Sequence, residues 1–196
     1  MDGTSVRQPP VELQGSERPT VLTAMKVVDR SAVARHPSAN ACLQGRFRGT
    51  RAVGSVVERV GVTSETVTFR EASLRGLIAC DNSPGRREEN RRWCGVSYGV
   101  LHSGRLRDPH LDVGCSTSDG EQMGFVWVQP APATRYVAVL QPGYAEVYEV
   151  AAGLPVRVAT TTDVEIEGSR ASFDLSEHDA SGGLVRKYRL EAAVAG

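Results

Sequence analysis

The chain has 196 residues, of which 40% are hydrophobic and 23% charged, and its 23 basic and 23 acidic side chains leave no formal net charge. This composition is typical of a globular protein and argues against a disordered chain. A net charge of zero gives no reason to expect a nucleic-acid partner. Apolar runs such as GFVWV are far shorter than the roughly 20 residues that cross a bilayer, so we expect no transmembrane segment.

The first 18 residues are polar and lack the apolar core of a secretory signal. We interpret residues 1–18 as a flexible leader and residues 19–196 as a single domain. A faint echo between VTFREASL (67–74) and VEIEGSRASF (164–173) leaves open a division into halves 19–100 and 101–196.

Most of the chain consists of short runs rich in β-branched and aromatic residues, bounded by Gly, Pro, Ser or Asp. In chain order the runs are 19–28, 56–62, 66–69, 74–80, 94–101, 123–129, 135–141, 144–150, 154–160, 163–167, 171–177 and 184–192. Their spacing of roughly ten residues is typical of antiparallel sandwiches and barrels. One short helix is expected, at 29–37, before Pro37. The sequence therefore predicts an all-β protein, a mainly antiparallel β-sandwich or barrel-like domain with little helix.

The strand patterns also predict which runs are buried. In GFVWV, Phe125 and Trp127 point to one face and Val126 and Val128 to the other, and YVAVL behaves in the same way. Strands that are apolar on both faces belong in the middle of a layered structure. By contrast DVEIE (163–167) alternates, which predicts a half-exposed strand with its glutamates outward.

Four cysteines, Cys42, Cys80, Cys94 and Cys115, lack the Cys-x-x-Cys spacing of a zinc site. Of the three possible pairings we favour Cys80–Cys94 with Cys42–Cys115, because residues 80 and 94 lie at the two ends of one loop between predicted strands. Disulfides persist in oxidising compartments. The cysteines thus favour an extracytoplasmic protein, secreted or a cell-surface ectodomain whose signal or anchor is absent from this chain. The alternative is a cytoplasmic protein with four buried thiols.

The most charged stretch of the chain lies between Cys80 and Cys94. A bridge between the two cysteines would hold DNSPGRREENRRW as a loop with fixed ends. Its exposed arginines suit an acidic protein partner or a carboxylated glycan, and the candidate binding residues are Arg86, Arg87, Arg91, Arg92 and Trp93. The alternative is a solvated hairpin tip.

Two patterns resemble sites that carry chemistry. GVSYG (95–99) spells the nucleophile elbow of α/β-hydrolases around Ser97, with His178 later in the chain, but the following residues cannot form the helix that the motif requires. In DPHLDVGC, Asp108, His110 and Asp112 alternate, so an extended strand would place them on one face as a start for a metal site.

We therefore expect a non-catalytic extracytoplasmic β domain that serves binding or interaction, without a cofactor and with an unknown protein or acidic glycan as partner. The alternative is a hydrolase or metal-dependent enzyme that uses residues 97–115 and His178. The spatial arrangement of the candidate residues distinguishes the binding domain from the enzyme. An enzyme would bring Ser97, His110 or His178 together with carboxylates in a concave pocket.

Overall fold

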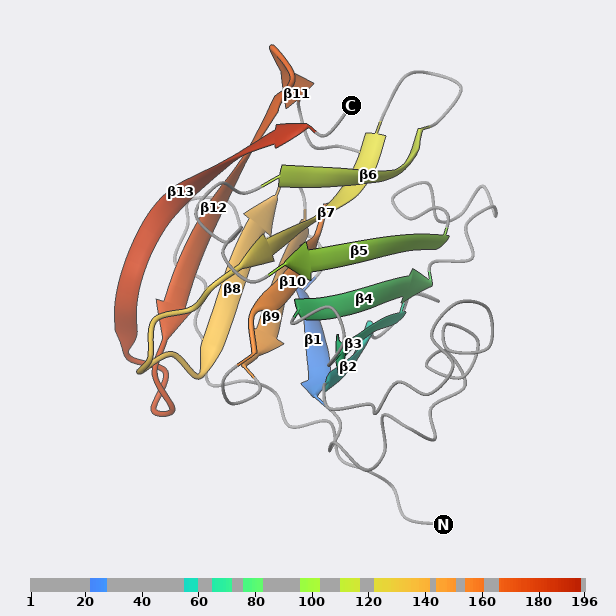
Figure 1. Ribbon diagram of the computed structural model, residues 1–196. Helices are drawn as coiled ribbons and strands as arrows, with labels where there is room; N and C mark the ends of the chain where they lie inside the picture. The colour runs from blue at the N-terminus through green and yellow to red at the C-terminus, as the bar shows by residue number, and fades with distance from the viewer. Residues whose placement is uncertain are drawn as a thin grey trace.

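A computed structural model describes residues 122–141, 144–150, 154–160 and 166–194 continuously, together with six strands between residues 22 and 116. Every regular element in this part of the chain is a strand (Figure 1). The strands are β1 (Leu22–Val27), β2 (Ser55–Arg59), β3 (Glu65–Glu71), β4 (Gly76–Asn82), β5 (Val96–His102), β6 (His110–Ser116), β7 (Gln122–Val128), β8 (Tyr136–Gln141), β9 (Tyr144–Glu149), β10 (Val156–Ala159), β11 (Ile166–Glu167), β12 (Arg170–His178) and β13 (Leu184–Val194).

Neighbouring strands follow the order β10-β7-β6-β13-β12-β8-β9-β1-β2-β3-β4-β5, and β11 pairs with β12. All pairings are antiparallel except β1 with β9 and β13 with β6. The described part is therefore all-β and mainly antiparallel, as the sequence predicts. Strand β6 was absent from the predicted runs, because its polar residues do not resemble a buried strand. The predicted helix at 29–37 lies outside the described residues.

Strands β7 and β8 are buried on both faces, which confirms the prediction from their two-sided apolar pattern. Val126 and Val128 pack in the main core with strands β8, β9, β10 and β12. Trp127, on the other face of β7, packs with Leu77 and Ala79 of β4. The core is thus layered, with β7 in its interior. The exposed Glu167 of β11 also agrees with the half-exposed strand predicted for 163–167.

The outward edge of the short strand β10 is capped by side chains of its neighbours. The backbone N–H of Ala159 donates to the hydroxyl of Tyr148 at 3.0 Å, and its carbonyl accepts from the side-chain amide of Gln141 at 2.9 Å. Because buried backbone groups must find partners, these two bonds allow β10 to pack inside the fold without another strand beside it.

Strands β12 and β13 form a long hairpin at one margin of the sheet (Figure 1). In β12, Ala171, Phe173 and Leu175 are buried while Arg170 and Asp174 are exposed, so one face meets the core and the other meets water. The connecting turn is held by Asp179, whose carboxylate accepts from the backbone N–H groups of Ser181 and Gly183 at 2.8 and 2.9 Å. The described residues contain no helix long and apolar enough to cross a bilayer.

Candidate functional site

The turn end of the β12–β13 hairpin holds a fully buried carboxylate, Glu177. The β12–β13 register places Glu177 directly opposite Arg186. One carboxylate oxygen accepts from the Arg186 guanidinium at 2.6 Å and from the Tyr188 hydroxyl at 2.9 Å. The other accepts from the Thr134 hydroxyl at 2.6 Å and from the Ala131 backbone N–H at 2.8 Å. We call Glu177, Arg186, Tyr188 and Thr134 the Glu177 cluster.

These contacts decide the charge of the carboxylate. Burial raises the pKa of Glu177, but the hydrogen bonds from Arg186, Thr134, Ala131 and Tyr188 lower it, and together they bring the pKa below its usual value of 4.5. Burial and the bond to Glu177 raise the pKa of Tyr188, so its hydroxyl stays a donor. Glu177 is therefore ionised at neutral pH.

The Glu177 cluster fixes the first part of β13 rather than offering a reactive group. Each carboxylate oxygen already accepts two hydrogen bonds from protein donors, which leaves Glu177 poorly placed to act as a base or metal ligand. Arg186 also donates to the carbonyl of Gln129 at 3.1 Å and lies over the Tyr188 ring at 4.8 Å. With 46% of its side chain exposed, Arg186 connects this buried network to the surface.

A second set of buried polar side chains lies between β7, β9 and β10. Glu146 accepts a hydrogen bond from the Tyr148 hydroxyl. Arg157 is almost fully buried and lies over the rings of Phe125 and Trp127, at 4.9 and 5.2 Å from their centroids. Stacking of a guanidinium on aromatic faces compensates part of the cost of burying its charge. This set stabilises the layers of the core and has no exposed group.

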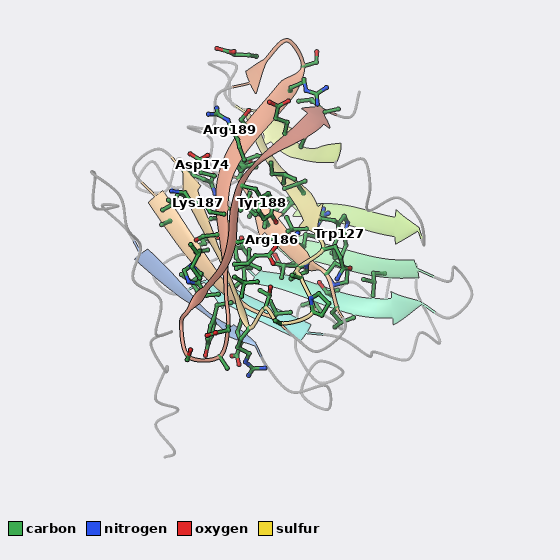
Figure 2. The ribbon with its side chains drawn as sticks, turned by 90° about the vertical axis from the view of Figure 1, so that its left-hand side faces the viewer. Trp127, Asp174, Arg186, Lys187, Tyr188 and Arg189 are labelled. Carbon is green, nitrogen blue, oxygen red and sulfur yellow. The ribbon has the colours of Figure 1, made fainter. Side chains whose placement is uncertain are left out.

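The exposed face of the hairpin carries the accessible charges. Figure 2 shows the hairpin from its edge, with Asp174 and Lys187 to one side and Arg186 and Tyr188 to the other. Lys187, Arg189 and Glu191 are all exposed. The two large hydrophobic side chains at the start of β13 are exposed as well, Leu184 at 62% and Val185 at 37%.

Strand β13 is paired along only one of its sides for most of its length. β12 pairs with it from Leu184 to Ala193, whereas β6 reaches only Ala193 and Val194. Within the described residues no other strand pairs with β13. We call Lys187, Arg189 and Glu191, with their backbone groups, the β13 edge.

His178, the sequence-predicted histidine, lies buried at the end of β12. Its two ring nitrogens are within hydrogen-bond distance of the Gly182 carbonyl, at 3.1 Å, and the Ser176 hydroxyl, at 3.0 Å. These contacts suit a histidine that orders the adjacent turn. No carboxylate is among them.

The structure does not bring His178 to the predicted metal residues. His178 pairs with Leu184 at one end of β13, whereas His110 of β6 pairs with Ala193 at the other end. Nine residues separate the two positions, which corresponds to roughly 30 Å along an extended strand. Asp112 lies in β6 opposite Phe125, two residues further on. The described residues include no group of three His, Cys, Asp or Glu that could hold a metal ion.

Other predicted site residues are described in part or not at all. Ser97 lies in β5 opposite Asp81, where only the backbone is described. The candidate metal residue Asp108 and all five binding residues of the 81–93 loop, Arg86, Arg87, Arg91, Arg92 and Trp93, lie outside the described residues.

Cys80 is buried in β4 and is disulfide-bonded. Its partner is not among the side chains that the structure describes: Cys42 and Cys94 lie outside the described residues, and only the backbone of Cys115 is described, in β6. The pairing Cys80–Cys94 with Cys42–Cys115 therefore stays a prediction.

Sequence reasoning missed the Glu177 cluster, although the signal was present. In ASFDLSE, Glu177 follows Ala171, Phe173 and Leu175 at strand spacing, which places a carboxylate on the apolar face. A buried charge needs a partner, and Arg186 in the next run supplies one. The open edge of β13 had no such signal, because pairing depends on strands that are distant in sequence.

Comparisons of the chain with models of protein families, with curated proteins and with solved structures found no match.

Proposed function

We propose that this chain is a non-catalytic β domain of an extracytoplasmic protein that binds a protein partner through exposed basic residues. One observation carries the proposal: among the described strands none pairs with β13 on the side away from β12 before Ala193, and Lys187 and Arg189 are exposed there. Exposed strand edges are sites of association unless they are covered.

The buried ionisable groups support binding over catalysis. Glu177 is held by four donors, and His178 contacts a carbonyl and a hydroxyl within its own hairpin. A catalytic group needs an accessible position and a partner that activates it. In the described part of the chain these two groups serve the stability of the hairpin.

The extracytoplasmic placement is part of the proposal and is supported by the disulfide-bonded Cys80. Structural disulfides persist in secreted and cell-surface proteins and are rare in the cytosol. The arginine-rich 81–93 loop would then be a second basic surface, with Arg86 and Arg92 available to an acidic partner.

A binding screen tests the proposed function. The full chain is applied to an array of tiled acidic and basic peptides and to an array of uronate-bearing and neutral glycans, and is also assayed against ester and peptide substrates. We expect retention on acidic peptides without turnover of any substrate. Turnover that is lost in Ser97→Ala or His178→Ala would instead support the enzyme alternative. Retention on acidic glycans alone would contradict the protein partner.

The double variant Arg86→Ala with Arg92→Ala separates the loop from the β13 edge in this screen. If the loop contributes, the double variant retains the thermal midpoint of the parent and binds the acidic ligand at least about tenfold more weakly. Unchanged binding at physiological salt would show that the loop is a solvated tip.

A further inference from the structure

We propose that the β13 edge takes up an extended acidic segment of a partner protein, which adds to the sheet as a further strand beside β13. The inference rests on the proposed function and names its site and the chemistry of its partner.

The backbone of β13 presents hydrogen-bonding groups to the open side. Val194 donates its N–H to Ser169 at 2.8 Å, on the side of β12. Because backbone groups alternate in direction along a strand, the N–H and C=O groups of Lys187, Arg189 and Glu191 point away from β12. These are the groups that an added strand would bind.

The length of the open edge suits one added strand. At one end, the register shifts between Glu177 and His178, which places a bulge in β13 next to Arg186. At the other end, β6 occupies the edge of Ala193. The interval from Arg186 to Ala192 is roughly 20 Å long, the length of an average strand.

The exposed side chains favour carboxylates in the added strand. On the outer face Lys187 lies opposite Ser176 of β12, and Arg189 lies opposite the single carboxylate of Asp174. Glu191 is already within 3.4 Å of Arg170. Acidic side chains opposite Lys187 and Arg189 would therefore form favourable cross-strand pairs.

The other face of β13 favours apolar side chains between those carboxylates. Tyr188 and Leu190 are partly buried and pack against the main core. A strand added beside them would extend that core at alternate positions. The partner segment that fits is thus extended, with acidic and apolar residues alternating.

A second copy of the chain fits the edge poorly. Antiparallel pairing of two β13 strands centred on Lys187 or Tyr188 places basic residues opposite basic residues. Centring on Arg189 sets Arg189 against itself while pairing Lys187 with Glu191. Centring on Leu190 pairs Arg189 with Glu191 but sets Lys187 against Ala193, whose edge β6 occupies. Each of these registers therefore carries a like-charge pair or a clash with β6, whereas an acidic segment meets neither, so the edge favours an acidic partner over a second copy.

The test uses the full chain and a fluorescent synthetic heptapeptide of alternating Glu and Val, with binding followed by anisotropy. The comparison peptides are a Lys-Val heptapeptide and the Glu-Val peptide with alternate backbone nitrogens methylated on its hydrogen-bonding side. Arg189→Pro removes an outward N–H without touching the β12 pairing, and Lys187→Glu with Arg189→Glu reverses the charge. Arg135→Gln, an exposed arginine that pairs with Glu149 outside the β13 edge, is the matched control for loss of one basic charge.

We expect saturable binding of the Glu-Val peptide only, weakened about tenfold or more by Arg189→Pro and by the charge reversal, and changed less than about twofold by Arg135→Gln. The methylated peptide tests the same backbone hydrogen bonds with the unmodified protein. Strand addition can therefore be tested even if Arg189→Pro fails to fold. Equal binding by the methylated peptide or by folded Arg189→Pro would overturn strand addition, and equal binding by the Lys-Val peptide would overturn the acidic partner.

Absence of Glu-Val binding at millimolar peptide would also overturn the inference. The proposed function would then stand if the array screen still retained other acidic peptides, and fall if it retained none. Light scattering tests whether a second copy of the chain occupies the edge instead. A dimer that Arg189→Pro dissociates would show that the partner is a second copy and not an acidic segment.

Discussion

Glu177 is an ionised side chain with no exposure to solvent, beside a guanidinium that is half exposed. Removing a carboxylate from water costs several kcal/mol, which its partners must offset. Its four hydrogen bonds join three parts of the chain: the 129–135 segment, β12 and β13. At the residue scale this carboxylate therefore determines how the turn end of the hairpin is held.

Replacing Glu177 by Gln tests this role. Glu177→Gln keeps the shape but removes the charge and places an amide against donors, so we expect the free energy of unfolding to fall by about 2–4 kcal/mol. The measurement is urea unfolding followed by fluorescence. The matched control is Glu149→Gln, a partly exposed partner of Arg135, which should cost less than about 1 kcal/mol. Equal losses in the two variants would contradict the role given to Glu177.

The same residue predicts how stability depends on pH. Because the pKa of Glu177 is lower in the folded state than its usual value of 4.5, the unfolded chain binds more protons at acidic pH. The stabilisation is complete above the usual pKa and is lost as pH falls through the folded-state pKa. Asp179, whose pKa is also lowered by its hydrogen bonds to Ser181 and Gly183, acts in the same direction.

The difference between parent and Glu177→Gln isolates the contribution of Glu177. We expect this difference in unfolding free energy to be constant near about pH 7 and to shrink below about pH 4.5. A difference that grows on acidification would show that Glu177 is not held as an anion.

At the element scale, a tight turn and a pair of side-chain hydrogen bonds position strands whose placement the hydrophobic pattern alone does not determine. The turn between β11 and β12 has positive φ at both central residues, Gly168 at 54° and Ser169 at 64°. Such a turn matches the twist of the flanking strands. The edge of β10 is closed by Tyr148 and Gln141 on the backbone of Ala159. Each of these two features joins a local conformation to the register of neighbouring strands.

The turn predicts opposite effects at adjacent positions. A Cβ at Gly168 meets no atom within 4 Å, so Gly168→Ala tests backbone strain alone. We expect it to lower the free energy of unfolding by about 1 kcal/mol, because left-handed backbone is unfavourable for Ala. Ser169→Gly relieves the same strain and should leave stability unchanged or raise it by up to about 0.5 kcal/mol. Thermal unfolding of both variants checks the signs, and a destabilised Ser169→Gly would contradict the interpretation.

The β10 cap predicts a cost for removing one hydroxyl. Tyr148→Phe deprives Ala159 of an acceptor and Glu146 of a donor in a buried site, so we expect a loss of about 1–3 kcal/mol. Tyr136→Phe, on the partly buried opposite face of the neighbouring strand, should change stability by less than about 0.5 kcal/mol. The denaturant midpoints of the two variants measure whether the Tyr148 hydroxyl stabilises the edge of β10. Similar midpoints would mean that the edge of β10 does not need the hydroxyl.

For the whole molecule, the strand path runs through β1, which joins a sheet of early strands to one of later strands. Strands β6 to β13 come from residues 110–194, and the other strands from residues 22–102. Packing of Leu77 and Ala79 against Trp127 and Leu154 brings the two groups of strands into contact. A disulfide between the two groups of strands, such as the predicted Cys42–Cys115, would hold this packing together.

Disulfide mapping tests the covalent links and the compartment together. If all four cysteines pair, as we propose, intact mass should show no alkylated cysteine before reduction and four after it. Peptide mapping should then recover Cys80–Cys94 and Cys42–Cys115. A Cys42–Cys80 link would overturn this pairing, and a free Cys42 would also weaken the extracytoplasmic placement.

The sequence by itself determined most of the secondary structure of the described chain, because the alternation of apolar and polar residues in a strand is a local property of the sequence. Alternation and β-branched runs predicted twelve of the thirteen strands and the two-sided burial of β7 and β8. Strand β6 was missed because His110 and Asp112 give it a polar pattern, and its pairing with β7 and β13 stabilises it instead.

Only the tertiary structure decided which side chains act together. His178 and the residues around His110 looked combinable in the sequence, and the register separates them along β13. Glu177 and Arg186 looked like ordinary strand charges, and the register makes them a buried pair. The open β13 edge likewise follows from the register, because among the described strands only β6 reaches that side of β13, at Ala193 and Val194. Register and strand order depend on contacts between distant segments, and these leave no periodic signal in the local sequence.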